Sequence, residues 1–269
     1  SSVVISGNSI GGSSAFAAGT AMQFVGGTNF RGIYMDVASS SRTSSISNNT
    51  VRNIVIKSAS TYTFGGIETV TGPIHVTGNN IGDPLVPNSI LFSDSTLASF
   101  IGISCNSSQN VHKINIAQNT VSNVSILDTA GTSKYFYGIN YFNNSLLIDT
   151  TFVSKNVIKH LNYSGKGDFA ALKINGGQNG TAFTDIAENI VESINLTLNF
   201  NATSYGIYIS SAPARVYGNR IGSSLVGNDI NIGRKGKHYG FYIYPINSVG
   251  TIIIDQDTIQ NVNITQTDN

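Results

Sequence analysis

The chain has little cysteine, little charge and no long apolar run. Cys105 is its single cysteine, which excludes a disulfide bond within the chain. Lys and Arg number 15 against 14 Asp and Glu in 269 residues, so the net charge is +1, and a nucleic-acid-binding protein would need a basic surface. No apolar run reaches the roughly 18 residues of a membrane span. We therefore expect neither nucleic acid binding nor direct membrane insertion.

The remaining composition predicts one folded domain. Hydrophobic residues make up 40% of the chain, which argues against disorder. Asn, Ser, Thr and Gly must supply the polar surface, and no linker or change of composition divides the chain. The sequence starts in a strand-like segment without Met or a signal-like segment. We expect a single domain over 1–269, as a segment of a longer secreted protein whose other domains are neighbours.

One short motif recurs along the whole chain. It is seen in Ile114 to Ile126, where an apolar residue stands three before Asn119 and another stands two after it. Alternation on both sides predicts strand, bend, strand, and Asn tolerates the left-handed conformation that a bend needs. We expect the Asn residues to stack as a hydrogen-bonded ladder. Its members are Asn8, Asn49, Asn79, Asn119, Asn156, Asn189 and Asn219, with Asp257 in the last position.

A second motif separates the Asn units and gives the period. It reads FxGI at Phe30, Phe64 and Phe100, and related segments follow. The period is about 35 residues, since successive spacings of the central small residue are 34, 36, 36, 33, 35 and 34. Three short strands per repeat are typical of a parallel β-helix, here of about eight coils. The small residues are Gly32, Gly66, Gly102, Gly138, Ala171, Gly206 and Gly240.

Strand alternation assigns the two faces of the Gly-Ile strand. The Ile after each Gly and the residue two places later should point inward, which buries Cys105 as a small apolar residue. The Phe two places before each Gly should stack with its equivalents along the axis. The outward face predicts a ligand-binding site, because tyrosine rings and polar groups suit sugars. It comprises Tyr34, Asp36, Glu68, Asn140, Lys173, Tyr208, Tyr242 and Tyr244.

The repeated N-x-I units and Gly-Ile strands resemble the right-handed parallel β-helix proteins of the pectin-lyase-like superfamily. The GNxIG and FxGI segments are also similar to secreted, adhesin-like surface proteins of Bacteroidota. This resemblance covers essentially the whole chain and implies an all-β, right-handed solenoid at an extracellular or cell-surface location. It does not choose between functions, because the superfamily contains lyases, hydrolases and adhesins.

The catalytic motifs of the superfamily are absent from the sequence. There is no Asp-Asp pair, no His followed by Gly, and no metal-ligand spacing among the four His residues. We therefore expect no catalytic residues, no metal and no cofactor. The predicted function is a non-catalytic adhesin or stalk segment that binds a polysaccharide or cell-surface glycan. The alternative is a polysaccharide lyase or glycoside hydrolase, for which Asp36 and Glu68 are the candidate acid and base.

Overall fold

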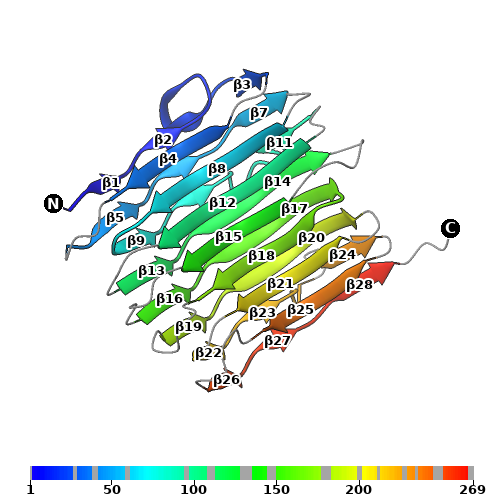
Figure 1. Ribbon diagram of the computed structural model, residues 1–269. Helices are drawn as coiled ribbons and strands as arrows, with labels where there is room; N and C mark the ends of the chain where they lie inside the picture. Colours follow the sequence, from blue (N-terminus) through cyan, green and yellow to red (C-terminus); the bar gives the residue numbers. More distant parts are fainter. Residues whose placement is uncertain are drawn as a thin grey trace.

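The computed structural model describes residues 2–26, 29–37, 42–57, 61–93, 97–107, 113–127, 135–143, 150–176, 183–198, 202–210, 213–225, 229–233, 236–244 and 251–265. It confirms a right-handed parallel β-solenoid. Three parallel sheets form its faces, and the strands stack from the blue N-terminal end to the red C-terminal end (Figure 1). No helix among the described residues is long and apolar enough to cross a membrane.

The first sheet contains the strands that precede the ladder Asn residues. In spatial order these are β1 (Val4–Ser6), β5 (Ser44–Ser47), β9 (Ile74–Thr77), β13 (Lys113–Ala117), β16 (Thr150–Ser154), β19 (Phe183–Ala187), β22 (Ala214–Tyr217) and β26 (Ile252–Asp255).

The second sheet contains the strands that follow the ladder. Its main path is β2 (Ser9–Ile10), β6 (Thr50–Val51), β10 (Asn80–Ile81), β14 (Thr120–Leu127), β17 (Val157–Gly165), β20 (Ile190–Leu198), β23 (Arg220–Ile221) and β27 (Thr258–Ile259). Where the strand of a repeat is interrupted, a second segment continues it: β3 (Met22–Val25), β7 (Ile54–Lys57), β11 (Ile90–Phe92), β24 (Ile230–Gly233) or β28 (Val262–Thr265). A short 3-10 helix, η1 (Ala15–Ala17), lies in the loop between β2 and β3.

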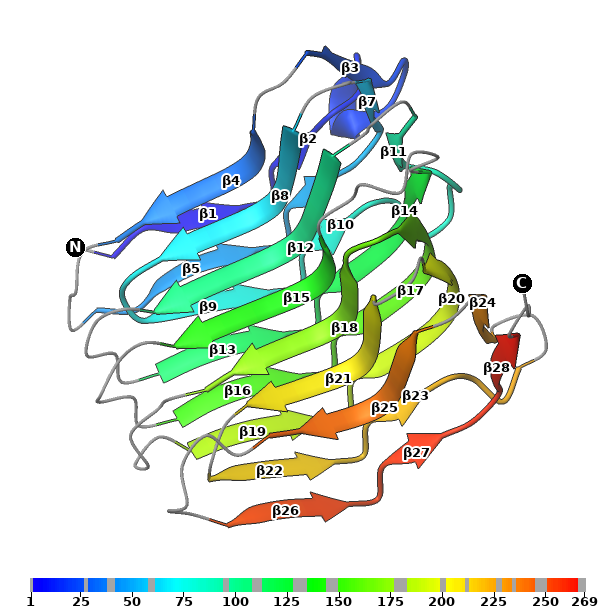
Figure 2. The same cartoon turned by 45° about the vertical axis from the view of Figure 1, so that its right-hand side comes forward.

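The third sheet contains the Gly-Ile strands. These are β4 (Phe30–Asp36), β8 (Thr61–Val70), β12 (Leu97–Ser107), β15 (Tyr135–Asn143), β18 (Asp168–Asn175), β21 (Thr203–Ser210) and β25 (Lys237–Ile243). Figure 2 shows this sheet in front of the first, with the interior between them. We call one repeat, with its strand in each sheet, a level.

The number of complete turns is smaller than the sequence predicts. About five turns of roughly 35 residues are present, against the predicted eight coils. From β5 to β21, every level has a strand in all three sheets and a buried interior. The first level and the last two levels carry the same Asn motif. The first has a neighbouring level on one side only, and the eighth has no described strand in the third sheet. Their inward residues Ile5 and Phe241 are therefore only partly buried, and Ile254 is exposed.

The predicted Asn ladder is present and runs through the buried interior. Asn119 accepts hydrogen bonds at Oδ1 from the backbone N–H (3.0 Å) and the Nδ2 (2.9 Å) of Asn79. Its own Nδ2 donates to the carbonyl of Val76 (2.8 Å) and to Oδ1 of Asn156 (3.0 Å). The pattern repeats from Asn49 to Asn219, and each of these amides bonds to the ladder residues of both neighbouring levels. At the last level, Asp257 has a buried Oδ2 without a hydrogen-bond partner, where the ladder otherwise has a donor.

One part of the ladder interpretation is wrong. The left-handed residue at the bend is not the ladder Asn but the residue before it, as at Asn48 (φ 56°), Gln118 (φ 59°), Lys155 (φ 57°) and Glu188 (φ 54°). A left-handed conformation costs a non-Gly residue about 1–2 kcal/mol. The ladder therefore requires Asn for its hydrogen bonds, and the preceding residue carries the backbone strain.

The predicted phenylalanine stack is confirmed inside the third sheet. The distance between the centroids of consecutive rings is 4.9 Å for Phe30–Phe64, 5.3 Å for Phe64–Phe100, 4.6 Å for Phe100–Phe136 and 5.3 Å for Phe136–Phe169. These spacings lie in the range at which aromatic pairs attract each other beyond their area burial. The stack fixes the register of one sheet, as the Asn ladder fixes the corner between the other two.

Candidate functional site

The glycine of each Gly-Ile strand interrupts the alternation of its faces. The register pairs Tyr205 with Tyr239 and Ile207 with Phe241, and leaves the glycines between them unpaired. A Cβ on Gly206 would meet Ile221 Cδ1 at 2.7 Å, so this glycine faces the interior, as the buried Ile207 after it does. Because the glycine and the isoleucine after it both face the interior, the alternation of inward and outward side chains shifts by one residue at this point. The residue before each glycine therefore points outward, which simple alternation misses.

Two columns of side chains consequently cover the outer face of the third sheet. The central column is Tyr34, Glu68, Ser104, Asn140, Lys173, Tyr208 and Tyr242, aligned level by level. It contains six of the eight predicted site residues, while Asp36 and Tyr244 lie two positions farther along their segments. The second column is Arg31, Gly65, Ile101, Tyr137, Ala170, Tyr205 and Tyr239. The residue directly before each repeat glycine, as in Tyr205-Gly206 and Tyr239-Gly240, is the signal that the sequence interpretation overlooked.

Four tyrosines form a cluster at the C-terminal part of this face. Tyr205 stacks on Tyr239 with 5.6 Å between centroids, and Tyr208 stacks on Tyr242 with 5.4 Å. The two stacks meet edge to face, at 5.1 Å between Tyr205 and Tyr208. All four are partly exposed, so no described segment covers them. Most ring faces contact another tyrosine. A ligand on this surface would therefore meet mainly ring edges and hydroxyl groups.

Lys173 connects the tyrosine cluster to the middle of the face. Its Nζ lies 3.0 Å from the hydroxyl of Tyr137, 4.3 Å from that ring's centroid and 5.9 Å from the Tyr208 ring. Burial lowers the pKa of Lys173, against the opposing effects of Tyr208 and Asp168. Burial, with smaller contributions from Asp168 and Tyr208, raises the pKa of Tyr137 to about 12. The tyrosine hydroxyl therefore remains protonated at neutral pH and available for hydrogen bonds.

The N-terminal part of the face is polar, and its carboxylates have partners. Glu68 Oε2 lies 2.5 Å from Arg31 Nε, and the Arg31 guanidinium lies 4.8 Å from the Tyr34 ring centroid. Asp36 accepts a hydrogen bond from Thr71 Oγ1 at 2.9 Å. A shallow hollow of about 190 Å³ follows along the face, lined by Gly65, Ser104, Asn106 and Asn140 among others. Small side chains at successive levels create this hollow.

Neither the thiol nor the metal-ligating side chains of the described residues form a reactive or metal-binding site. Cys105 is buried, and burial raises the pKa of its thiol to about 12, which makes it a poor nucleophile. No group of three or more His, Cys, Asp or Glu side chains that could hold a metal ion occurs in this part of the chain. His112 lies outside the described residues.

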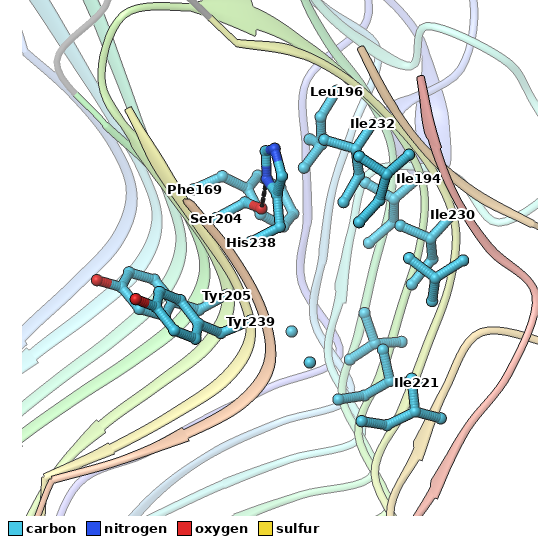
Figure 3. Close-up of a pocket in the computed structure, with 16 residues that line it drawn as sticks. Phe169, Ile194, Leu196, Ser204, Tyr205, Ile221, Ile230, Ile232, His238 and Tyr239 are labelled. Carbon is cyan, nitrogen blue, oxygen red and sulfur yellow. Dashed lines mark hydrogen bonds between the residues drawn. The ribbon is translucent and has the colours of Figure 1, made fainter. Parts of the chain in front are cut away.

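A second hollow, of about 220 Å³, lies inside the C-terminal end of the solenoid, between the second and third sheets. Ser204 and His238 replace phenylalanine in the interior column here, and Ser204 Oγ lies 2.8 Å from His238 Nδ1. Figure 3 shows this pair facing Ile194 and Ile232 across the hollow. Tyr205 and Tyr239 also line this hollow, but their rings extend to the opposite side of their sheet (Figure 3), so the tyrosine cluster and the hollow lie on opposite sides of the same strands.

Comparison with known proteins gives no match to a family model, a curated protein or a solved structure. The geometry of the third sheet's outer face is therefore the basis for a functional proposal.

Proposed function

We propose that this chain is a non-catalytic, extracellular or cell-surface β-helix that binds an extended glycan along the outer face of its third sheet. In this proposal it is an adhesin or stalk segment related to the pectin-lyase-like superfamily and to adhesin-like surface proteins of Bacteroidota. The observation that carries the proposal is the pair of aligned outer columns that contains Tyr205, Tyr208, Tyr239 and Tyr242.

The spacing and chemistry of these columns support a polymeric ligand. Neighbouring strands lie about 4.8 Å apart, so equivalent groups recur at regular intervals over seven levels of the third sheet. Tyrosine edges and hydroxyls can contact both the apolar and the polar parts of a sugar. The hollow beside Asn140 adds amide groups that can donate and accept hydrogen bonds. Each contact is weak, and many copies on a surface would raise the overall affinity through avidity.

The alternative function is a polysaccharide lyase or glycoside hydrolase. Glycoside hydrolysis uses two carboxyl groups that flank the scissile bond, one as an acid and one as a base or nucleophile. On this face Glu68 is ion-paired with Arg31, and Asp36 is hydrogen-bonded to Thr71. This arrangement favours binding over cleavage, because neither carboxylate is free of a competing partner.

Affinity electrophoresis in polysaccharide gels tests the binding proposal. The variant Tyr208→Ala/Tyr242→Ala should lose its retardation and keep its cooperative unfolding. Tyr217→Ala is the matched control, since Tyr217 is a partly exposed tyrosine on the first sheet, beside Arg215. Equal retardation of the double variant and the unmodified protein would refute binding at this face. Unfolding of the double variant would identify the tyrosines as packing residues.

An activity assay on the same polysaccharides separates the two functions. Reducing ends and unsaturated products should not accumulate over hours with the unmodified protein. Their accumulation would refute the non-catalytic proposal, and Glu68→Gln and Asp36→Asn would then be the first variants to examine.

A further inference from the structure

A second ladder of amide side chains lies on the outer surface of the second sheet. Asn162 Nδ2 donates to Ser125 Oγ at 3.2 Å, and Asn195 Nδ2 donates to Asn162 Oδ1 at 3.0 Å. The same pattern continues through Asn231 and Asn263. We call these five residues the outer ladder, to distinguish them from the buried Asn ladder at the corner of the solenoid.

The outer ladder uses only half of its hydrogen-bonding capacity. An amide has two N–H groups, and its oxygen can accept two hydrogen bonds. In the buried ladder the side chain of Asn119 uses all four, since it accepts two and donates two. Within the described part of the chain, Asn195 donates once, to Asn162, and accepts once, from Asn231. One N–H group and one lone pair of this exposed amide therefore remain for a ligand.

A groove of about 300 Å³ lies beside the outer ladder at levels four to six. Its wall is the loop of residues 82–89, which contributes Pro84, Leu85 and Pro87. Leu85 is 87% exposed, so its side chain is available to a ligand. The floor includes Asn162 and Asn195. The volume is at the lower end of the range for small-molecule sites.

The bend residues of the second sheet explain why the floor is open at these levels. At levels two, four and eight the bend residue is a left-handed Asn, whose Nδ2 donates to a carbonyl in the inserted loop of the preceding level. These pairs are Asn53 with Gly19, Asn123 with Asp83 and Asn261 with Ser223. At levels five and six the left-handed residues are His160 (φ 52°) and Ser193 (φ 55°), and the preceding strands, β14 and β17, have no inserted loop. Their side chains line the groove instead.

The described residues that line the groove are uncharged at neutral pH. His160 is the one titratable residue among them. Burial, with a smaller contribution from Lys159, lowers its pKa against an opposing effect of Glu192, so the imidazole is mostly neutral at pH 7. Glu192 itself is ion-paired with Arg220 at 3.0 Å. A charged ligand would lose hydration here without gaining an opposite charge in the groove.

We propose that this groove binds a neutral saccharide of one or two rings, held by the outer ladder together with His160 and Ser193. A sugar hydroxyl both donates and accepts a hydrogen bond, which matches the free N–H group and lone pair of a ladder amide. The C–H groups of the ring pack against Leu85 and Pro84, which removes apolar surface from water. The site lies on a different sheet from the tyrosine cluster and does not depend on glycan binding there.

Backbone amide NMR shifts of the whole 269-residue chain test the proposal. The probes are the neutral disaccharides cellobiose, maltose and N,N′-diacetylchitobiose, with the charged disaccharide digalacturonate for comparison. At least one neutral disaccharide should shift the amides of His160 and Ser193 saturably, with a Kd on the order of 1 mM. Digalacturonate should bind there about fivefold more weakly or not at all.

Matched variants test the floor and the wall of the groove. Asn195→Ala should weaken binding by about threefold or more, whereas Asn263→Ala, in the same ladder but outside the groove, should change it by less than about 1.5-fold. Leu85→Ser should also weaken binding by about threefold or more. Leu225→Ser is its control, because Leu225 is 65% exposed in the equivalent loop of level seven and does not line this groove. Cooperative urea unfolding verifies that each variant is folded.

Three results would overturn the proposal. The first is no saturable shift with any of the three neutral disaccharides, and the second is equal weakening by Asn195→Ala and Asn263→Ala. The third is shifts confined to the amides around Tyr208 and Tyr242, which would assign the saccharide to the third sheet. Unchanged shifts at His160 in the variant Tyr208→Ala/Tyr242→Ala support a separate site.

Discussion

Asn119→Ala tests whether the Asn ladder stabilises the solenoid. The substitution removes four side-chain hydrogen bonds, two accepted from Asn79 and two donated to Val76 and Asn156. Asn79 Nδ2 keeps acceptors at Ile46 and Thr77, and Asn156 Oδ1 still accepts from the backbone N–H of residue 119. The backbone N–H of Asn79 and the carbonyl of Val76 lose these partners inside the protein.

The expected magnitude follows from these two groups. A buried polar group without its partner costs about 1–3 kcal/mol, so the substitution should lower the free energy of unfolding by about 2–6 kcal/mol. No penalty for a left-handed conformation is added, because that conformation belongs to Gln118. Asn231→Ala is the matched control. This exposed Asn donates a side-chain hydrogen bond to Asn195 at 3.0 Å and accepts one from Asn263 at 3.1 Å, and the loss of these exposed bonds should cost less than about 1 kcal/mol.

Urea unfolding and hydrogen exchange measure the effect together. The urea midpoint should fall for Asn119→Ala and stay nearly constant for Asn231→Ala. Exchange of the Asn79 amide should accelerate selectively, because Asn119 Oδ1 is its acceptor. Equal midpoints for the two variants, or an Asn79 amide that exchanges as slowly as before, would refute the role assigned to the ladder.

Three further predictions concern packing, the ladder end and the thiol. Gly102→Ala should cost about 1–3 kcal/mol in urea unfolding, because its Cβ would lie 2.5 Å from the Gly138 carbonyl, and Gly65→Ala should be nearly neutral; equal effects would contradict the close approach. Asp257→Asn should raise the urea midpoint by replacing a buried, unpartnered oxygen with a donor, and a lower midpoint would argue against this account. Cys105 should resist thiol reagents at pH 8 until urea unfolds the chain, since burial raises its pKa to about 12; rapid labelling of the folded protein would show that the thiol is accessible.

The sequence predicted the interior of this protein better than its ends. Interior positions repeat with a fixed period, so the Asn ladder, the Phe stack and the buried Cys105 could be assigned from spacing alone. The predicted number of coils was wrong because the Asn motif shows that a level exists, but does not show whether other levels pack against it on both sides and complete a buried turn. The exposed Ile254 at the C-terminal end has the same sequence context as the buried Val216.

The outer face was predicted only in part, for a geometric reason. The central column followed from alternation and contains Lys173, Tyr208 and Tyr242. The second column could not be predicted in this way, because the inward glycine shifts the alternation of inward and outward side chains by one residue. Tyr205 and Tyr239 were therefore overlooked, although each stands directly before a repeat glycine. Whether either column binds glycan stays a prediction.

The two faces of the third sheet are under different physical constraints, and this difference shapes what the chain can do. Inward side chains must match the levels above and below, as the phenylalanine stack does. Outward side chains need only tolerate their neighbours, so their chemistry changes along the axis from the Arg31–Glu68 ion pair to the four tyrosines. A polymer bound along this face would therefore meet a polar end and an aromatic end. The face has a direction, and a glycan with chemically distinct ends should bind in one orientation.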